Sequence, residues 1–339
     1  MSLDTGSRTV PPPQPAPPPS RPGAATSGRR WSSRRSRVDQ KASPYLYVAP
    51  FFLLFAVFGL YPLVYTAWVS LHDWDYLAGD QGFVGLRNYT ELLRDDWFTG
   101  AVFNTIGLFV VATVPQMLLA LSLAYALNRQ LRARTLFRMG ILVPNITSVV
   151  AVGIIFAQLF SRDWGLVNWL LHLVGVDAID WRASRWASWT AIATMVDWRW
   201  TGYNALIFLA AMQAIPRDLY ESAAIDGASN WRQFWRITVP LIRPTIVFAV
   251  IISTIGGLQL FTEPLVFIGG NGAIFGGSQR QAQTVTMYLI ETAFRRFDFG
   301  YGAAIAWLLF LLIMVISILN VWIVRRLSTY GSHSAKAGA

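Results

Sequence analysis

The sequence predicts an all-α membrane protein that crosses the bilayer six times. Apolar residues make up 54% of the 339 residues and charged residues only 14%, whereas soluble chains carry about 25% charged residues. Six apolar stretches follow one another, each close to the ~20 residues that a helix needs to cross the hydrocarbon core. A polar stretch, residues 214–240, interrupts this series between the fourth and fifth spans.

The spans are expected at residues 46–70, 102–127, 138–160, 188–213, 241–267 and 301–324. Aromatic side chains gather at their ends, as Trp68 and Trp322 do, which is typical of membrane–water interfaces. The spans and their loops form one expected domain, residues 45–327. The proline-rich, basic tail at residues 1–44 cannot build a core and is expected to be disordered, with its arginines on anionic lipid. A short tail, residues 328–339, follows the last span.

The distribution of positive charge orients the chain. The segments 1–44, 128–138, 214–244 and 325–339 carry 19 of the 28 Lys and Arg residues but 5 of the 18 acidic residues. Because Lys and Arg are enriched in short cytoplasmic loops, both termini and the polar stretch are expected in the cytoplasm. This topology accounts for the formal charge of +10, so no nucleic-acid partner is expected.

Several classes of chemistry are excluded by the residues that the chain lacks. It has no cysteine, which excludes disulfides, thiolate metal sites and catalytic thiols. Its three histidines lie far apart without metal-ligand spacing, so no metal site is expected. Lysine occurs only at Lys41 and Lys336, so residues 42–335 contain no phosphate-binding loop of the lysine-bearing type. If ATP drives this protein, a separate chain must bind it.

The polar stretch predicts two short helices with a sharp stop between them. Pro216 suits the first helical position, and Asp218 and Glu221 place negative charge at the positive end of the helix dipole. Gly227 can adopt the left-handed conformation that ends a helix, and Ser229 can cap the next helix. Four residues are expected on one side of that second helix: Trp231, Phe234, Trp235 and Thr238.

These residues resemble the cytoplasmic coupling motif of permease subunits of ATP-binding cassette importers. That motif reads Glu-Ala-Ala, then Asp-Gly-Ala, then Ile-x-Leu-Pro. It is matched by Glu221, Ala223, Asp226, Gly227, Ala228, Ile237 and Pro240, with Ser222 and Val239 as conservative departures. On pattern alone, an amphipathic hairpin that only links two spans would explain the stretch equally well.

Weaker similarities over residues 44–327 indicate the sugar-importing branch of that family, the maltose- and cellobiose-type uptake systems. They include Phe83–Tyr89, Trp198–Asn204 and Phe294–Ala304. The resemblance implies a permease in a bacterial plasma membrane that is not itself an enzyme and holds no cofactor. It also implies a second permease subunit, two ATPase subunits that bind ATP and magnesium, and an extracytoplasmic solute-binding protein.

The resemblance also implies which residues dock on the ATPase. The short first helix of the polar stretch would seat in a cleft of the ATPase and pass its closure to the membrane spans. The expected docking residues are Glu221, Ala223, Ala224, Asp226 and Gly227.

Polar residues inside the spans are costly in lipid and are candidates for the substrate path. Gln259 and Glu263 share one face of span five, and Pro264 follows them, so the helix is expected to break there and open backbone groups to a cavity. Aromatic rings would stack on sugar C–H surfaces, and amides and carboxylates would bond hydroxyls. The expected path comprises Trp198, Arg199, Trp200, Tyr203, Asn204, Gln259 and Glu263. The same residues could instead only join helices by hydrogen bonds.

Charged residues near the middle of the spans suggest ion pairs. Asp197 and Arg199 could pair across chains or with Glu263. Gln116 is expected only to join helices.

The external loops give weaker signals. Loops 71–101 and 161–187 carry aspartates and tryptophans that could receive an extracytoplasmic partner or could be only solvated lids. Loop 268–300 begins with a glycine-rich run and is expected to be a flexible external turn.

The expected function is inward transport of a sugar, a di- or oligosaccharide, by alternating access driven by partner ATPases. One alternative keeps this architecture and changes the solute to a glycerol phosphate ester, for which Arg199 would be the only candidate cation. Another is an ion-gradient-driven secondary transporter, for which only Glu263 and Asp197 could act as an acidic relay. The identity of the sugar stays open, as does the choice between a homodimeric and a heterodimeric pore.

Overall fold

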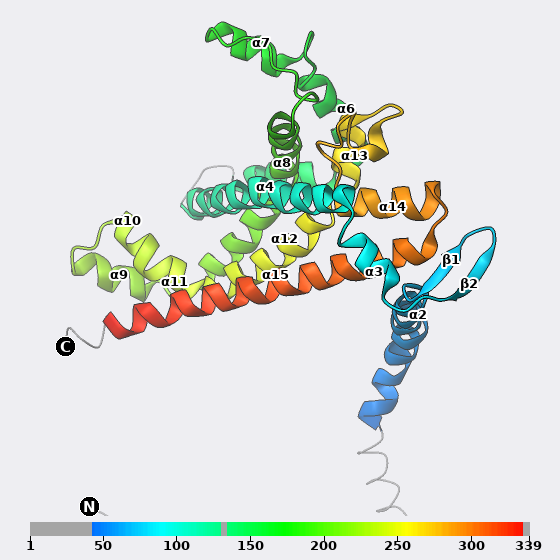
Figure 1. The fold of residues 1–339 in the computed structure, drawn as a ribbon. Coiled ribbons are helices and arrows are strands. Elements are labelled where there is room, and N and C mark those ends of the chain that lie inside the picture. The colour runs from blue at the N-terminus through cyan, green and yellow to red at the C-terminus, as the bar shows by residue number, and fades with distance from the viewer. Residues whose placement is uncertain (1–42, 130–133, 335–339) are drawn as a thin grey trace, which may run out of the picture. The chain divides into compact units, whose positions relative to one another are not determined.

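The computed structural model describes residues 43–129 and 134–334 (Figure 1). Of the predicted tail at residues 1–44, only residues 43 and 44 lie within these ranges. Residues 335–339 of the predicted tail 328–339 also lie outside them. The chain divides into two compact units, Met1–Pro62 and Leu63–Ala339.

The described part of the first unit is a single apolar helix that continues into the second. Together they form a candidate membrane span, Ser43–Val69, of 27 residues. It contains a π-helical turn, η1 (Ala56–Leu60), followed by α2 (Tyr61–Val69). Pro62 cannot donate the N–H that a regular α-helix needs at this point, which explains the change in helical hydrogen bonding.

The second unit is mostly helical. Its strands are β1 (His72–Asp75) and β2 (Gly79–Phe83), and its helices are α3 (Arg87–Leu92), α4 (Asp96–Asn128), α5 (Arg134–Ile146), α6 (Val149–Leu159), α7 (Leu166–Leu173), α8 (Arg185–Gln213), α9 (Asp218–Ile225), α10 (Asn230–Gln233), α11 (Val239–Leu241), α12 (Arg243–Leu258), α13 (Thr262–Ile268), α14 (Val285–Arg295) and α15 (Phe299–Ser334), with the π-helical turn η2 (Phe234–Thr238) and the 3-10 turn η3 (Ala273–Phe275). The first residues of the predicted tail 328–339 therefore continue α15.

The described chain is mostly helical, as predicted, but the loop 71–101, which was expected to be external, contains two short strands. β1 and β2 form an antiparallel hairpin in which His72 is paired with Phe83. The Asp75 carboxylate accepts hydrogen bonds from the backbone N–H groups of Leu77 and Ala78, which closes the turn. The hairpin is short and polar, so it lacks the apolar alternation by which a strand is recognised in sequence.

The described residues contain three straight candidate spans, or five if two bent helix pairs are each one span. The straight ones are Ser43–Val69, Asp96–Asn128 and Phe299–Trp322. The predicted span 138–160 is bent by 92° between α5 and α6. The predicted span 188–213 is the 29-residue helix α8, whose polar centre lowers its mean hydropathy below that of the candidate spans. By length and composition, the described residues therefore contain fewer candidate spans than the six that were predicted.

Helices α4 and α8 form the centre of the second unit, where they cross (Figure 1). Gly107 of α4 lies against the indole ring of Trp189, and a Cβ at this glycine would lie 2.0 Å from that ring. Gly202 of α8 likewise meets the Ile141 carbonyl of α5. Small residues at these crossings let helices approach closely, as is typical of packing in membranes.

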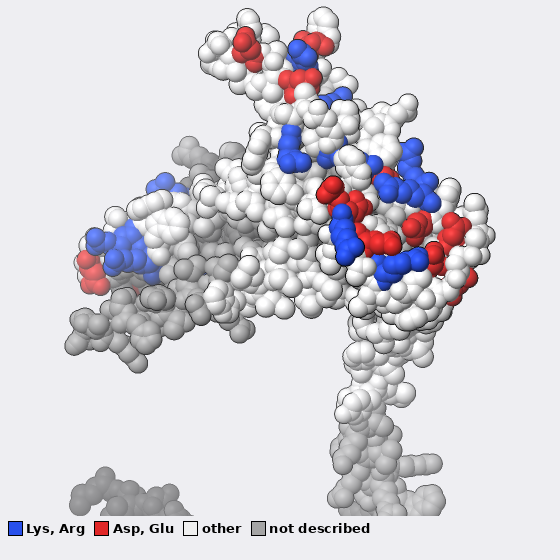
Figure 2. All heavy atoms as spheres, in the orientation of Figure 1, with Lys and Arg blue, Asp and Glu red and all other residues white. Residues whose placement is uncertain are grey.

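Charged side chains gather at the ends of the second unit. Figure 2 shows them over α7, over the hairpin and α14, and over α9 and α10, with a largely uncharged visible surface between the last group and the other two. This distribution fits a protein whose middle lies in lipid.

Loop 268–300 is not the flexible turn that its glycines suggested. Gly269 and Gly276 do adopt positive φ angles of 63° and 68°. From Gln281 to Ala293, however, most of the segment is buried, and Ala282 and Thr284 are fully inaccessible to solvent. Helix α14 follows, so the second half of this loop is an ordered part of the fold.

Candidate functional site

A cavity of about 310 Å³ lies between α4, α8, α12 and α13. It is lined by Thr113, Gln116, Val196, Trp200, Tyr203, Asn204, Ile252, Ser253, Ile255, Gly256, Gly257, Gln259, Leu260 and Glu263. Five of the seven residues predicted for the substrate path are among them: Trp200, Tyr203, Asn204, Gln259 and Glu263. Residues of the predicted spans four and five, far apart in sequence, therefore meet at one cavity.

Helical periodicity brings the α8 residues to the cavity. Trp200 and Asn204 lie one turn apart on the same face, and the ring of Tyr203 lies edge-on to that of Trp200 at 5.9 Å between centroids. The Asn204 side chain is buried and donates a hydrogen bond of 3.4 Å to the Ser253 hydroxyl of α12. The α8 face thus combines an aromatic surface with an amide whose hydrogen bond to the neighbouring helix is long.

The predicted break in span five lies at the cavity. Helix α12 ends at Leu258 and α13 begins at Thr262. In a continuous helix the Leu260 carbonyl would accept the N–H of residue 264, but that residue is Pro264 and has no N–H. The backbone leaves the helical path at this point, and Gln259 and Leu260 line the cavity in the break.

Arg199 and Glu263 form an ion pair of 2.8 Å between α8 and α13. Each side chain is 11% exposed, and the guanidinium also lies 5.9 Å from the Trp200 ring centroid. The pairing suggested for Arg199 is therefore with Glu263. Asp197 does not join it: its buried Oδ1 has no hydrogen-bond partner among the described residues.

Two residues predicted for the path lie outside the cavity lining. Arg199 is linked to the cavity through two residues that line it, Glu263 and Trp200. Trp198 is 45% exposed and packs on Phe156 of α6 at 5.7 Å between ring centroids. The helical wheel explains the difference, because Trp198 lies on the opposite side of α8 from Trp200.

At the other end of the second unit, helix α9 presents an exposed surface. All of its residues are described and none is buried. Glu221, Ala224, Asp226 and Gly227 are exposed, and Ala223 is half-buried. Side chains that are so exposed on a well-formed short helix are available to a partner protein.

The stop after α9 follows local backbone rules. Gly227 has a φ of 77°, its N–H bonds the Ala224 carbonyl, and the Ala228 N–H bonds the Ala223 carbonyl. This pair of bonds is the Schellman motif that ends helices at glycine. The helix begins at Asp218, so the prediction that Pro216 takes the first helical position is wrong, and this proline precedes the helix.

The second helix of this stretch is capped by Ser229, as predicted, whose hydroxyl accepts the Arg232 N–H at 3.4 Å. The rings of Trp231, Phe234 and Trp235 contact one another, as their predicted common side requires, but the four predicted residues differ in burial. Phe234 and Thr238 are buried, whereas Trp231 and Trp235 are 65% and 46% exposed. Phe234 faces inward, where its ring packs on that of Tyr125 at 4.6 Å between centroids. The two tryptophans remain exposed.

A family model described as "Binding-protein-dependent transport system inner membrane component" matches residues 116–329. The chain belongs to this family. The arabinooligosaccharides transport system permease protein AraP of Halalkalibacterium halodurans is 35% identical, over 84% of this chain and 88% of its own length. The lactose transport system permease protein LacF of Rhizobium radiobacter is 37% identical, over 83% and 93%. The trehalose/maltose transport system permease protein MalF of Thermococcus litoralis is 33% identical, over 83% and 93%.

Solved structures agree with this family membership at the level of the fold. A crystal structure of a bacterial ABC transporter involved in the import of the acidic polysaccharide alginate gives a TM-score of 0.71 at 21% identity, over 88% of this chain and 99% of that chain. A bacterial alginate ABC transporter in complex with its alginate pentasaccharide-bound periplasmic protein gives 0.73 at 20% identity, over 86% and 97%. The resemblance to importer permeases is confirmed, and the chain is an inner membrane transport component.

Membership of this family favours ATP-driven import over the ion-gradient alternative. Three further polar residues line the cavity that were not predicted for the substrate path: Thr113 and Gln116 of α4 and Ser253 of α12. Gln116 is buried within a long apolar helix, so the rule that polar residues inside spans are functional candidates could have found it. No sequence pattern shows that it faces α8 and α12.

Proposed function

We propose that this chain is a permease subunit of an ATP-binding cassette importer that moves a di- or oligosaccharide into the cell by alternating access. The lining of the 310 Å³ cavity is the observation that carries this proposal. Hydroxyl and amide groups line it beside the Trp200 ring, and its one carboxylate, Glu263, is already paired with Arg199. Such a lining suits a neutral solute with many hydroxyl groups and an apolar C–H face.

The names of the relatives support a sugar. AraP, LacF and MalF are named for arabinooligosaccharides, for lactose and for trehalose and maltose. A glycerol phosphate ester would instead require a cation to face its phosphate. No lysine or arginine is among the described residues that line the cavity, and Arg199 is held by Glu263, so the sugar is favoured.

The proposed assembly extends beyond this chain. A second permease subunit would complete the pore, two ATPase subunits would bind ATP and magnesium, and a solute-binding protein would deliver the sugar from outside. Within this chain, α8 would be the fourth of six spans despite its polar centre, because Arg199 is neutralised by an ion pair and its neighbours line a cavity. Both termini and α9 would then lie in the cytoplasm, where α9 would dock on an ATPase.

The docking role of α9 can be tested by cross-linking, because the chain has no cysteine of its own. A single cysteine at Ala228, beside the exposed end of α9, would be cross-linked in native membranes and the attached protein identified by mass spectrometry. We expect an ATPase subunit. Failure to capture an ATPase in a folded complex that contains its native partners would contradict the docking role.

The solute can be tested by uptake into cells or proteoliposomes that carry the whole complex. We expect uptake of radiolabelled di- or oligosaccharide to fall about tenfold or more in Trp200→Ala, since one stacking surface is removed. Trp307→Ala is the matched control, because Trp307 packs on Phe310 of its own helix α15 and lies outside the cavity lining. Uptake of a glycerol phosphate ester in place of sugar would favour the alternative solute.

A further inference from the structure

The break in span five has a specific hydrogen-bond donor. Pro264 leaves the Leu260 carbonyl without its helical partner, and this residue is only 6% exposed, so water does not readily supply one. The Thr284 hydroxyl donates to the Leu260 carbonyl oxygen at 2.7 Å. A residue 24 positions further along the chain therefore completes the backbone of the break.

Thr284 is also the first residue of an ordered external element. It is fully buried, and its hydroxyl accepts the Met287 N–H at 3.3 Å as the N-cap of α14. The next backbone N–H, of Val285, bonds the Thr105 hydroxyl of α4 at 2.9 Å. One short segment thus joins the break in span five to α14 and to α4.

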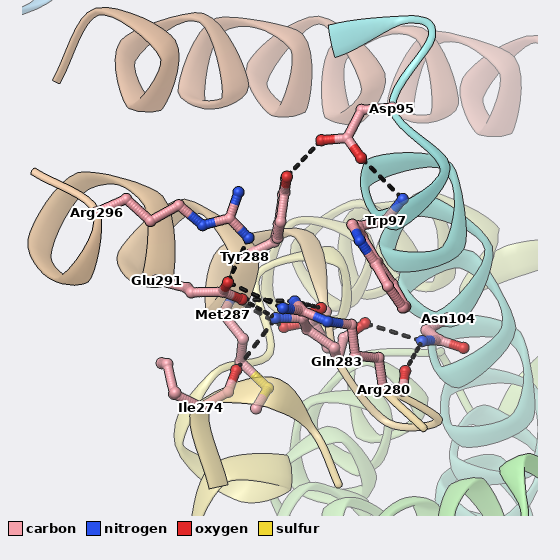
Figure 3. A network of polar contacts seen from close by, with 11 residues as sticks. Asp95, Trp97, Asn104, Ile274, Arg280, Gln283, Met287, Tyr288, Glu291 and Arg296 are labelled. Atoms are coloured by element: carbon pink, nitrogen blue, oxygen red, sulfur yellow. Dashed lines mark hydrogen bonds and ion pairs between the residues drawn. The ribbon is translucent and has the colours of Figure 1, made fainter. Parts of the chain in front are cut away.

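The segment before Thr284 is held as firmly. The Asn104 amide of α4 donates to the carbonyls of Arg280 and Gln283 at 2.8 Å and 3.0 Å. The Arg280 guanidinium, in turn, bonds both carboxylate oxygens of Glu291 on α14, at 2.6 Å and 3.0 Å. Figure 3 shows Arg280, Gln283 and Arg296 converging on Glu291, with Asn104 reaching in from α4.

The same break forms part of the cavity. Gln259 and Leu260 lie in it and Glu263 lies on the first turn of α13, and all three line the cavity. The lining also includes Thr113 and Gln116 of α4, the helix to which the external segment is bonded. The position of the break relative to α4 therefore depends on the external segment as well as on the helices themselves.

We propose that Thr284 is a positioning residue for the solute cavity. Its hydroxyl fixes the broken backbone at Leu260, and with it Gln259 and Glu263, to the external helix α14. Any displacement of α14 is thereby transmitted to the cavity wall. This inference rests on the proposed function, in which the cavity holds the transported sugar.

The hydroxyl can be tested by paired substitutions in the complete reconstituted transporter. Thr284→Val removes the donor and keeps the shape, whereas Thr284→Ser keeps the donor. Thr292→Val is the matched control, because Thr292 is a buried threonine on the same helix whose hydroxyl has no partner among the described residues. We expect sugar uptake per ATP hydrolysed to fall about tenfold in Thr284→Val, because a buried carbonyl is left without its donor. In Thr284→Ser and Thr292→Val, this ratio should stay within about twofold of the parent protein.

A second measurement reports on the cavity wall without transport. A single cysteine at Gln259, in a chain that otherwise has none, would be labelled with a thiol reagent and its labelling rate followed. We expect Thr284→Val to change this rate severalfold, and Thr284→Ser and Thr292→Val to leave it unchanged.

Two outcomes would overturn the inference. Equal effects of Thr284→Val and Thr292→Val would reduce Thr284 to a packing residue, and failure of Thr284→Ser to restore uptake and labelling would exclude the hydroxyl. Failure of the proposed function looks different: Trp200→Ala would then leave sugar uptake unchanged while the labelling rate at position 259 still responded to Thr284→Val.

Discussion

The two polar loops of this permease are built in opposite ways. The proposed coupling loop, residues 214–240, has an exposed first helix, α9, whose end is set by neighbouring backbone groups and by one glycine. The proposed external loop, residues 268–300, is largely buried over residues 281–293, and a helix more than 100 residues away bonds to its backbone, as when the Asn104 amide of α4 donates to the Arg280 carbonyl. The coupling loop is therefore shaped by local interactions and presents an exposed surface. The external loop is shaped by contacts with distant segments and is proposed to position the cavity wall.

This difference teaches where a substitution will act. In the coupling loop, the exposed side chains of α9 contribute little to folding, so their replacement is expected to affect docking. In the external loop, Glu291 is surrounded by Arg280, Arg296 and Gln283, so its replacement is expected to affect folding before it affects transport. The following predictions test that contrast in order of expected effect.

The largest effect is expected from Gly227→Asp in the coupling loop. The new side chain would meet no atom within 4 Å, so it would project from the proposed docking surface and add charge there. We expect transport to be lost while the complex retains ATP hydrolysis, which is measured in the same proteoliposomes.

Gly175→Asp provides the matched control for Gly227→Asp. Gly175 ends α7 with a φ of 82° and also has nothing within 4 Å, so the backbone strain of about 1–2 kcal/mol is the same. We expect Gly175→Asp to transport normally. Equal loss in both variants would show that strain, not docking, is responsible.

The next effect is expected from Glu291→Gln in the external loop. The carboxylate is 3% exposed and faces two guanidinium groups, and breaking a buried pair from one side destabilises by about 3 kcal/mol or more. We expect a clear fall in the thermal unfolding temperature of the purified protein in detergent or lipid. Glu91→Gln, which loses an exposed pair of 3.7 Å with Arg87, should change stability by less than about 1 kcal/mol, and a similar loss in both would contradict the contrast.

The same contrast explains what the sequence could predict. The stop at Gly227, the cap at Ser229 and the break before Pro264 were all predicted, because each follows from residue types within a few positions of the chain. The sequence did not predict that Trp198 lies away from the cavity or that Phe234 is buried while Trp231 is exposed. Both facts depend on which face of a helix meets a neighbour.

The external loop shows the limit most clearly. Its glycines correctly indicated turns, but nothing within residues 268–300 reveals that Asn104 and Thr105 bond to it from α4. Likewise, the sequence identified Gln259 and Glu263 as candidates but not Thr284, whose relevance appears only when it reaches Leu260. Local chemistry is readable in one chain, whereas contacts between distant segments require the fold.

Acid should weaken the external loop before the coupling loop. Burial alone would raise the pKa of the Glu291 carboxyl, but the hydrogen bonds from Arg280, Arg296 and Gln283 outweigh burial and hold that pKa below its ordinary value. A depressed carboxyl pKa contributes stability above the ordinary pKa, and this contribution is lost as the pH falls through the lowered value. We expect the stability difference between the parent protein and Glu291→Gln to be full near neutral pH and to shrink in acid, as measured by thermal unfolding from pH 7 downward. A difference that grew in acid would contradict the assigned direction.

The smallest effect is expected from Ser229→Ala, which removes the cap of α10. The lost hydrogen bond is long, at 3.4 Å, and loss of such a cap typically destabilises a helix by about 1 kcal/mol. Because the coupling loop is shaped locally, we expect faster hydrogen exchange at residues 231–233 and an unchanged global unfolding temperature, whereas Ser229→Asp should keep the protection. A fall in unfolding temperature as large as that of Glu291→Gln would mean that the coupling loop also supports the core, and the two loops would then differ in exposure but not in how they are held.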